Sequence, residues 1–445
     1  MKKRSFQRQY IRDISRRGIL KTAVGGTALG LGSTLMPSAL AAAQPLSKSG
    51  NPLRRQDPEL LISENLQTRP RDPLWGMAMS YGEDRLDLID LDNSQVLHSF
   101  EGFKAAHAVI PIEHLNRFVI HGFRLDPKTD ARIGTILVLD VDPVTKKWSV
   151  ALDRALKGGQ LLHWQPRPDL SEIVFNTIGD GGLHVLDTKT LKISSYIGGG
   201  KHSNMAMMDD LLIATDKMAG PSQLLITDRR TNQVLSRTNV GEWGHGVTVN
   251  FKRGEAYVWA KDGLHRISLA QKTMGKHLDL IPSLTAGERS WFCWTPQGGQ
   301  FSHDVAWGWD GERGDVYQPY LSAVDMHNAR IEKISTGDKD IRPSFLQVSP
   351  DSKLGLASLR GRQDIGIFNL ENNSFQGTVD VGPAHESFFE RDMAFCKDRR
   401  FALVTNSEDK SISLIDLTTR DEVRRIYLPR RPLWFKSLSG LLLSN

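Results

Sequence analysis

Apolar and polar residues alternate in short runs from Trp75 onward, and turn-forming residues separate the runs. Short runs of this kind predict β-strands, and no sustained period of 3.6 residues points to long helices. The runs recur with a coarse period of about 40 to 55 residues, which is the range of propeller blades. The pattern therefore predicts an all-β chain built from repeated units.

The repeat is clearest where an apolar run ends on an acidic or polar residue and a turn follows, as in Leu414-Ile415-Asp416. A divergent copy spans residues 265–269. The other copies span residues 88–92, 137–141, 185–189, 225–228, 321–325, 367–370 and 414–418. This recurrence predicts the third strand of each unit.

Residues 348–353, of the form VSPD-x-K, and residues 402–419, ALVTNSEDKSISLIDLTT, carry a family resemblance. They resemble the YVTN-type repeat of bacterial periplasmic propellers. The same broad superfamily includes the cytochrome d1 propeller, the methylamine dehydrogenase heavy chain and the nitrous oxide reductase N-terminal propeller. The resemblance covers about residues 74 to 445 and implies a fold more specifically than a function.

The expected fold is an all-β propeller of seven or eight blades, because about 370 residues follow this period. Residues 433–436 and 441–445 look like the first two strands of a unit that residues 75–90 complete. We therefore expect pairing of N- and C-terminal strands to close the propeller. The expected organisation is a signal peptide at 1–43, an extended lead-in segment at 44–73 and the propeller at 74–445.

Residues 1–43 have the three zones of an export signal, which are a basic stretch, an apolar run and a small-residue end. Residues 15–21, SRRGILK, resemble the twin-arginine pattern S/T-R-R-x-F-L-K, with Ile19 in place of Phe. The apolar run is short and glycine-rich for a membrane span. The sequence therefore predicts periplasmic localisation through the twin-arginine pathway and no membrane span after cleavage. Because this pathway exports folded proteins, it also raises the expectation of a cofactor.

Removal of the signal changes the charge. The whole chain has a formal net charge of +6, and residues 1–43 hold eight basic residues and one acid, so the mature chain is left at −1. The basic excess that would pair with nucleic-acid phosphates leaves with the signal, and we exclude nucleic acid as a partner. Cys293 and Cys396 fit neither CxxC nor CxxCH, so thiolate zinc sites and covalent haem attachment lack their signature.

Three histidines, His107, His202 and His245, stand just before the predicted inner strands. Inner strands line the channel of a propeller, so equivalent positions would form a ring of imidazoles suited to copper or to a haem-type tetrapyrrole. The further candidates are His163, within one place of this column, and His303 and His385, near strand starts. The alternative is that each imidazole hydrogen-bonds a neighbouring loop.

Arginines and tryptophans near the same strand starts suggest a second feature, a clamp for an anionic ligand. The arginines are Arg289, Arg342 and Arg391, and the tryptophans are Trp164, Trp243, Trp291 and Trp294. The alternative is that these arginines pair with blade-end acids while the rings fill the core.

The leading hypothesis is an exported periplasmic propeller that binds copper or a haem-type cofactor through channel histidines and acts in redox chemistry or cofactor assembly. The pattern leaves open whether the chain is an enzyme, and an enzyme of this kind would be an oxidoreductase. A periplasmic electron-transfer protein is the partner that this hypothesis implies. The alternative is a non-catalytic scaffold propeller that recognises a protein or cell-envelope partner.

Overall fold

A computed structural model gives the structure of the chain between residues 75 and 439. The gaps in the described residues are 81–84, 102–103, 127, 130, 143, 157–160, 168, 178–181, 199–203, 217–219, 243, 245, 261, 283–289, 293–304, 312–316, 326–327, 329, 350, 384–390, 397–399 and 430–431. The described residues all belong to one compact unit, Gln67–Asn445. The predicted signal and lead-in segment lie outside them.

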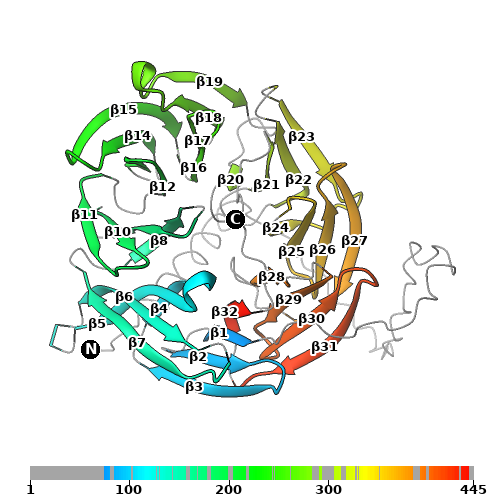
Figure 1. Cartoon of the computed structure of the whole chain (residues 1–445). Coiled ribbons are helices and arrows are strands. Elements are labelled where there is room, and N and C mark those ends of the chain that lie inside the picture. The colour runs from blue at the N-terminus through cyan, green and yellow to red at the C-terminus, as the bar shows by residue number, and fades with distance from the viewer. Residues whose placement is uncertain are drawn as a thin grey trace, which may run out of the picture. The chain divides into compact units, whose positions relative to one another are not determined.

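The described strands form eight four-stranded antiparallel sheets, which follow one another around a common axis (Figure 1). The all-β prediction is confirmed. The sequence repeat left seven or eight blades open, and seven is wrong. The divergent unit around residues 265–269 and the unit divided between the two chain ends each form a complete sheet, and neither is visible as a full repeat in the sequence.

We number the sheets as blades 1 to 8. Blade 1 contains β32 (Pro432–Ser439), β1 (Trp75–Ser80), β2 (Arg85–Asp90) and β3 (Gln95–Glu101); blade 2 contains β4 (Lys104–Ile112), β5 (Arg117–Leu125), β6 (Arg132–Val141) and β7 (Trp148–Ala155). Blade 3 contains β8 (Leu161–Pro166), β9 (Glu172–Thr177), β10 (Leu183–Asp187) and β11 (Ile193–Tyr196); blade 4 contains β12 (Met205–Met208), β13 (Leu211–Thr215), β14 (Pro221–Asp228) and β15 (Gln233–Glu242).

Blade 5 contains β16 (Val247–Asn250), β17 (Glu255–Ala260), β18 (Gly263–Ser268) and β19 (His277–Pro282); blade 6 contains β20 (Ser290–Phe292), β21 (Val305–Gly311), β22 (Tyr317–Asp325) and β23 (Arg330–Ser335). Blade 7 contains β24 (Pro343–Val348), β25 (Leu354–Leu359), β26 (Asp364–Asn369) and β27 (Ser374–Asp380); blade 8 contains β28 (Met393–Phe395), β29 (Phe401–Asn406), β30 (Ser411–Asp416) and β31 (Asp421–Tyr427).

Two short 3-10 helices, η3 (Glu113–Leu115) and η4 (Gln271–Thr273), are the helical elements of the described residues. Neither these turns nor any other helix in that part of the chain has the length and apolar character to span a membrane.

Every junction between consecutive blades is filled by a cluster of buried apolar side chains, including the junction of blade 8 with blade 1. The second strands are covered on both faces, so β17 is buried from Ala256 to Ala260, whereas the outer strand β15 alternates in burial. A single four-stranded sheet cannot bury both faces, and stacking the blades in a ring does so. This explains why the second and third strands are almost continuously apolar.

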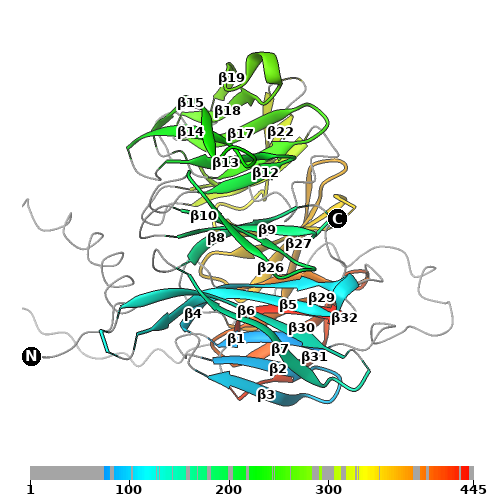
Figure 2. The ribbon, with the colours of Figure 1, turned by 60° about the vertical axis from the view of Figure 1, so that its left-hand side comes forward.

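The propeller is closed by β32, which pairs antiparallel with β1 and gives the sheet order β3-β2-β1-β32. The C-terminal part therefore supplies one strand of blade 1 and the N-terminal part supplies three. The expectation that two C-terminal strands open this unit is wrong, because β1 from the N-terminal part takes the second position of the sheet, beside β32. Blades 1 and 2 adjoin in both views (Figures 1 and 2).

The two faces of the propeller differ in what they expose. Inner strands begin, and second strands end, on one face, which we call the site face. The opposite face, which we call the turn face, carries the turns after the first and third strands. The antiparallel order of each sheet fixes this assignment for all eight blades.

Aspartate side chains build the turns after the third strands. In blade 3, Asp187 Oδ1 accepts the backbone N–H groups of Lys189 at 3.0 Å and Thr190 at 2.7 Å, and Leu191 adopts a left-handed φ of 62°. The same pairing of an Asp or Asn with a left-handed residue four positions later occurs at Asp90 and Ser94, Asp142 and Lys146, Asp228 and Asn232, Asn369 and Asn373, and Asp416 and Arg420. Side-chain capping of this kind is the physical reason for the repeat in the sequence.

Candidate functional site

The structure describes the side chains of three of the nine predicted site residues, His163, Arg342 and Arg391. The side chains of the others, His107, His202, His245, His303, His385 and Arg289, lie outside the described part.

The strand pairings refine the predicted histidine column. Val109, Met205 and Val247 are equivalent, because each pairs with the fourth residue of its second strand. Counted from these residues, His107 and His245 stand two positions earlier, but His202 stands three positions earlier. The sequence spacing of His202 from its inner strand therefore differs by one residue from that of His107 and His245.

His163 lies inside β8, one place before Trp164, which pairs with the fourth residue of β9. The pairing of β8 with β9 is irregular between Leu161 and Trp164, which places His163 in a bulge opposite Asn176. Asn176 Oδ1 accepts the backbone N–H of His163 at 2.9 Å, and the imidazole is partly buried. A bulge re-aims side chains at the end of a strand, and period-2 sequence patterns do not reveal it.

A repeated polar contact marks the site face. The fifth residue of the second strand accepts a hydrogen bond from the backbone N–H one place before the regular inner strand. The donors and acceptors are His163 and Asn176 at 2.9 Å, Asn204 and Thr215 at 3.3 Å, and Asp392 and Thr405 at 2.8 Å, in blades 3, 4 and 8. The contact satisfies a backbone N–H group that the hydrogen bonds between strands do not reach.

Blade 5 departs from this arrangement, because Trp259 occupies the fifth position of β17 and an indole has no acceptor. Trp259 is 3 % exposed, and its Nε1–H has no hydrogen-bond partner. In blade 4, Nδ2 of Asn204 is also a buried donor without a partner. Leaving a buried donor unpaired costs about 1 to 3 kcal/mol, so Trp259 and Asn204 are candidates for donating to an acceptor group of a ligand.

His121 occupies the corresponding fifth position of β5 and is fully buried. Its ring centroid lies 5.2 Å from that of Phe175 and 6.2 Å from that of Trp164, so it packs against blade 3. We did not predict His121 from the sequence. The feature of the sequence that could have revealed it is a polar residue inside the apolar run Phe118–Phe123, where every neighbour on the strand is buried.

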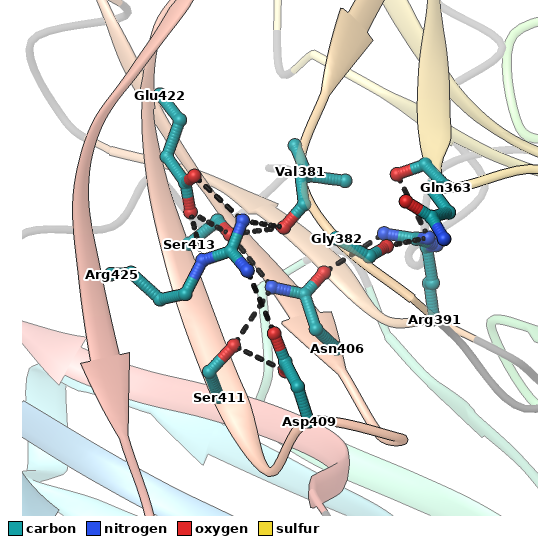
Figure 3. Close-up of polar contacts among 10 residues, drawn as sticks. All are labelled: Gln363, Val381, Gly382, Arg391, Asn406, Asp409, Ser411, Ser413, Glu422 and Arg425. Atoms are coloured by element: carbon teal, nitrogen blue, oxygen red, sulfur yellow. Dashed lines mark hydrogen bonds and ion pairs between the residues drawn. The ribbon is translucent and has the colours of Figure 1, made fainter. Parts of the chain in front are cut away.

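Arg391 lies in the junction of blades 7 and 8 and is 2 % exposed. Its guanidinium donates to Asn406 Oδ1 at 2.8 Å and to the backbone carbonyls of Gln363, at 3.1 Å, and Gly382 (Figure 3). These acceptors belong to both blades. The geometry assigns Arg391 to holding the two blades together.

The network continues beyond Arg391 through Asn406 (Figure 3). Asn406 Nδ2 donates to Ser411 Oγ at 3.1 Å and to Ser413 Oγ at 2.7 Å. Ser411 donates to Asp409 at 2.6 Å, and Arg425 binds Asp409 at 2.8 Å. Polar groups of this blade are thus joined into one chain of contacts, as buried polar groups require.

Arg342 has a different environment. Its side chain is 41 % exposed, its Nε donates to the backbone carbonyl of Lys339 at 2.9 Å, and Asp340 lies 4.0 Å away. Arg342 and Arg391 therefore differ in role, and no described contact joins them in one anion clamp.

No group of three or more His, Cys, Asp or Glu side chains within the described residues is placed to hold a metal ion. Cys396 is buried. The described part of the site face offers neutral donors and imidazoles, which suit a ligand that brings its own acceptor groups.

Comparison with known proteins gives the fold. No family model matches the sequence, and no curated protein matches it. A solved structure of apo AztD from Citrobacter koseri is 12 % identical and superposes with a TM-score of 0.63 over 83 % of this chain and 99 % of that chain. The dihydro-heme d1 dehydrogenase NirN in complex with DHE is 15 % identical, with a TM-score of 0.59 over 84 % of this chain and 78 % of that chain. Both structures are β-propellers, and the likeness places this chain in the same fold.

Proposed function

We propose that this chain is a periplasmic propeller that binds a haem-type tetrapyrrole on the site face and acts in redox chemistry or in assembly of the cofactor. The observation that carries the proposal is the pair of buried donors, Trp259 Nε1 and Asn204 Nδ2, which have no partner. A tetrapyrrole carries carboxylates that would accept from such donors.

A macrocycle fits the described residues better than a bare metal ion does. A protein-only zinc or copper site needs three or four convergent ligands, and the described residues contain no such group. A tetrapyrrole supplies four nitrogens to its metal and needs only one or two axial ligands from the protein. Copper, which the sequence also suggested, gains no support from the comparisons.

The structural likeness to NirN in complex with DHE agrees with this ligand class. The twin-arginine pattern of residues 15–21 agrees with it too, because that route exports proteins that have already folded around a cofactor. Residues 1–43 lie outside the described part, so export and periplasmic localisation remain part of the proposal.

The test is to titrate the purified full chain with ferric haem and to follow the visible absorption spectrum. We expect saturable binding at one equivalent. Trp259→Phe removes the indole donor and keeps an aromatic ring in the core. It should weaken binding about tenfold, because one lost hydrogen bond of about 1.4 kcal/mol corresponds to that factor.

Trp148→Phe is the matched control, since Trp148 packs with His98 and Phe100 near the turn face. It should bind haem like the wild type. Absence of a saturable spectral change, or equal affinities for the two variants, would overturn the proposal. In that case a partner recovered by crosslinking would favour the scaffold alternative.

A further inference from the structure

Three titratable side chains of blade 5 form a chain of hydrogen bonds that the proposed site does not use. Asp262 Oδ1 lies 2.9 Å from His265 Nε2, and His265 Nδ1 lies 2.9 Å from His277 Nε2. The two imidazole rings meet edge to face, with centroids 5.1 Å apart. His265 is 5 % exposed, whereas Asp262 and His277 lie at the surface.

These contacts fix the protons of the pair. The carboxylate of Asp262 only accepts, so His265 Nε2 carries a hydrogen and Nδ1 of the neutral ring accepts. His277 Nε2 must then donate. One added proton is accommodated on His277 Nδ1 without loss of either bond. A second proton leaves two N–H groups facing each other 2.9 Å apart, and that contact cannot persist.

The chain lies on the seam between blades 4 and 5. A Cβ added to Gly241 of β15 would be 2.9 Å from Asp262 Oδ1 and 3.2 Å from His265 Nε2, so β15 runs directly beside the pair. At Gly275, just before His277, an added Cβ would be 1.8 Å from Ser236 Oγ of β15. The chain just before His277 therefore lies against blade 4, where Thr238 Oγ1 also donates to the backbone carbonyl of Gly275 at 2.5 Å.

Several charged side chains surround His277 and influence its pKa. Burial and the neighbouring His265 lower the pKa of His277 below its usual 6.5, and Asp279 and Asp262 oppose this shift. Asp279 is itself paired with Arg266 at 2.7 Å on the other face of β18. The β15 residues in contact with this segment, Gly241 among them, carry no charge, and Glu242 follows them at the surface.

We propose that Asp262, His265 and His277 form a proton-operated latch that holds β19 to β18, at the seam with blade 4, while the imidazoles are neutral and releases it when both are protonated. Imidazoles are the side chains whose charge changes below neutral pH, and two imidazoles in contact take up protons as a coupled pair. Because the latch is defined by its own contacts, it does not depend on the proposed ligand.

The experiment is amide hydrogen exchange of the full chain from about pH 8 to about pH 4.5, corrected for the intrinsic pH dependence of exchange. In the wild type, exchange in β19 and at the end of β15 should rise about tenfold as the pair charges. His277→Gln should abolish this rise, because the amide still donates to His265 but does not titrate. His114→Gln, at another partly exposed histidine in η3, should leave it unchanged.

Asp262→Asn separates a latch from a merely structural contact. Loss of the carboxylate removes a charge that favours protonation of His277, so the NMR titration midpoint of the His277 ring should move to lower pH. A midpoint that stays in place or rises contradicts the proposal. Exchange in β19 that does not change with pH, or that changes equally in His277→Gln, also overturns it.

Discussion

Single residues on the inner strands show how far a sequence column predicts side-chain roles. Arg391 and His107 stand two places before the regular inner strand, so the sequence makes them equivalent. Arg391 nevertheless turns into the junction with blade 7 and donates to backbone carbonyls there. Sequence spacing gives the position along the strand, but the rotamer depends on which acceptors the neighbouring blade presents. Trp259 was missed for the same reason, because its unpaired donor is visible only in three dimensions.

Replacing Arg391 by Met should lower the free energy of unfolding by about 3 kcal/mol. The change removes a buried, charge-assisted set of hydrogen bonds and leaves Asn406 and two carbonyls without their donor. Urea denaturation monitored by tryptophan fluorescence measures the effect. Arg342→Met is the control, and since the Arg342 side chain is 41 % exposed it should cost less than about 1 kcal/mol. Equal losses for the two variants would contradict the role assigned to Arg391.

At the scale of strands and turns, the sequence predicted the third strands reliably, because the turn that follows each of them depends on a local hydrogen bond. The recurrent apolar run ending on Asp or Asn falls on a third strand in blade after blade, because the side chain caps the turn that follows it within four residues. In blade 2 the capping residue is Asp142, two places after the predicted Asp140, which instead pairs with Arg117 at 2.6 Å. Bulges such as that at His163 were not predicted, since they depend on the pairing partner.

The turn aspartates should make stability fall in acid. Backbone N–H groups donated to Asp187 outweigh its burial and lower its pKa below 3.8. A carboxylate with a depressed pKa in the folded state contributes stability that is present above the unfolded pKa of 3.8 and is lost as the pH falls through the folded value.

Asp187→Asn should keep the turn, as Asn369 does in blade 7, and remove this part of the acid sensitivity. Asp187→Ala should cost about 1 kcal/mol at neutral pH. Denaturation curves at pH 7 and at about pH 3 measure both effects, and an Asn variant as acid-sensitive as the wild type would refute the assignment.

At the scale of the whole molecule, ring closure was visible in the sequence only as an incomplete unit at each end. The structure joins them through β32 and β1, and Arg424 of blade 8 adds a 2.7 Å hydrogen bond to the backbone carbonyl of Asp92 in blade 1. How the unit divides, three strands and one, could not be predicted, because residues 441–445 are as apolar as a strand. Closure is therefore a property of pairing between segments some 350 residues apart, and period alone does not determine it.

Deleting β32 by ending the chain at Arg431 should be disproportionately destabilising. The deletion removes one strand of eight residues, but it leaves β1 as an open edge and takes away the strand that contacts β4 of blade 2 and β28 and β29 of blade 8. An exposed edge strand beside uncovered apolar surface favours aggregation. We expect the melting temperature to fall by about 10 °C or more, and a synthetic peptide of residues 432–445 should restore it by pairing with β1. A scrambled peptide of the same composition is the control. If the shortened chain melted at the temperature of the full chain, closure would have to reside in the contacts between blades 8 and 1, such as that of Arg424, and not in the paired strand.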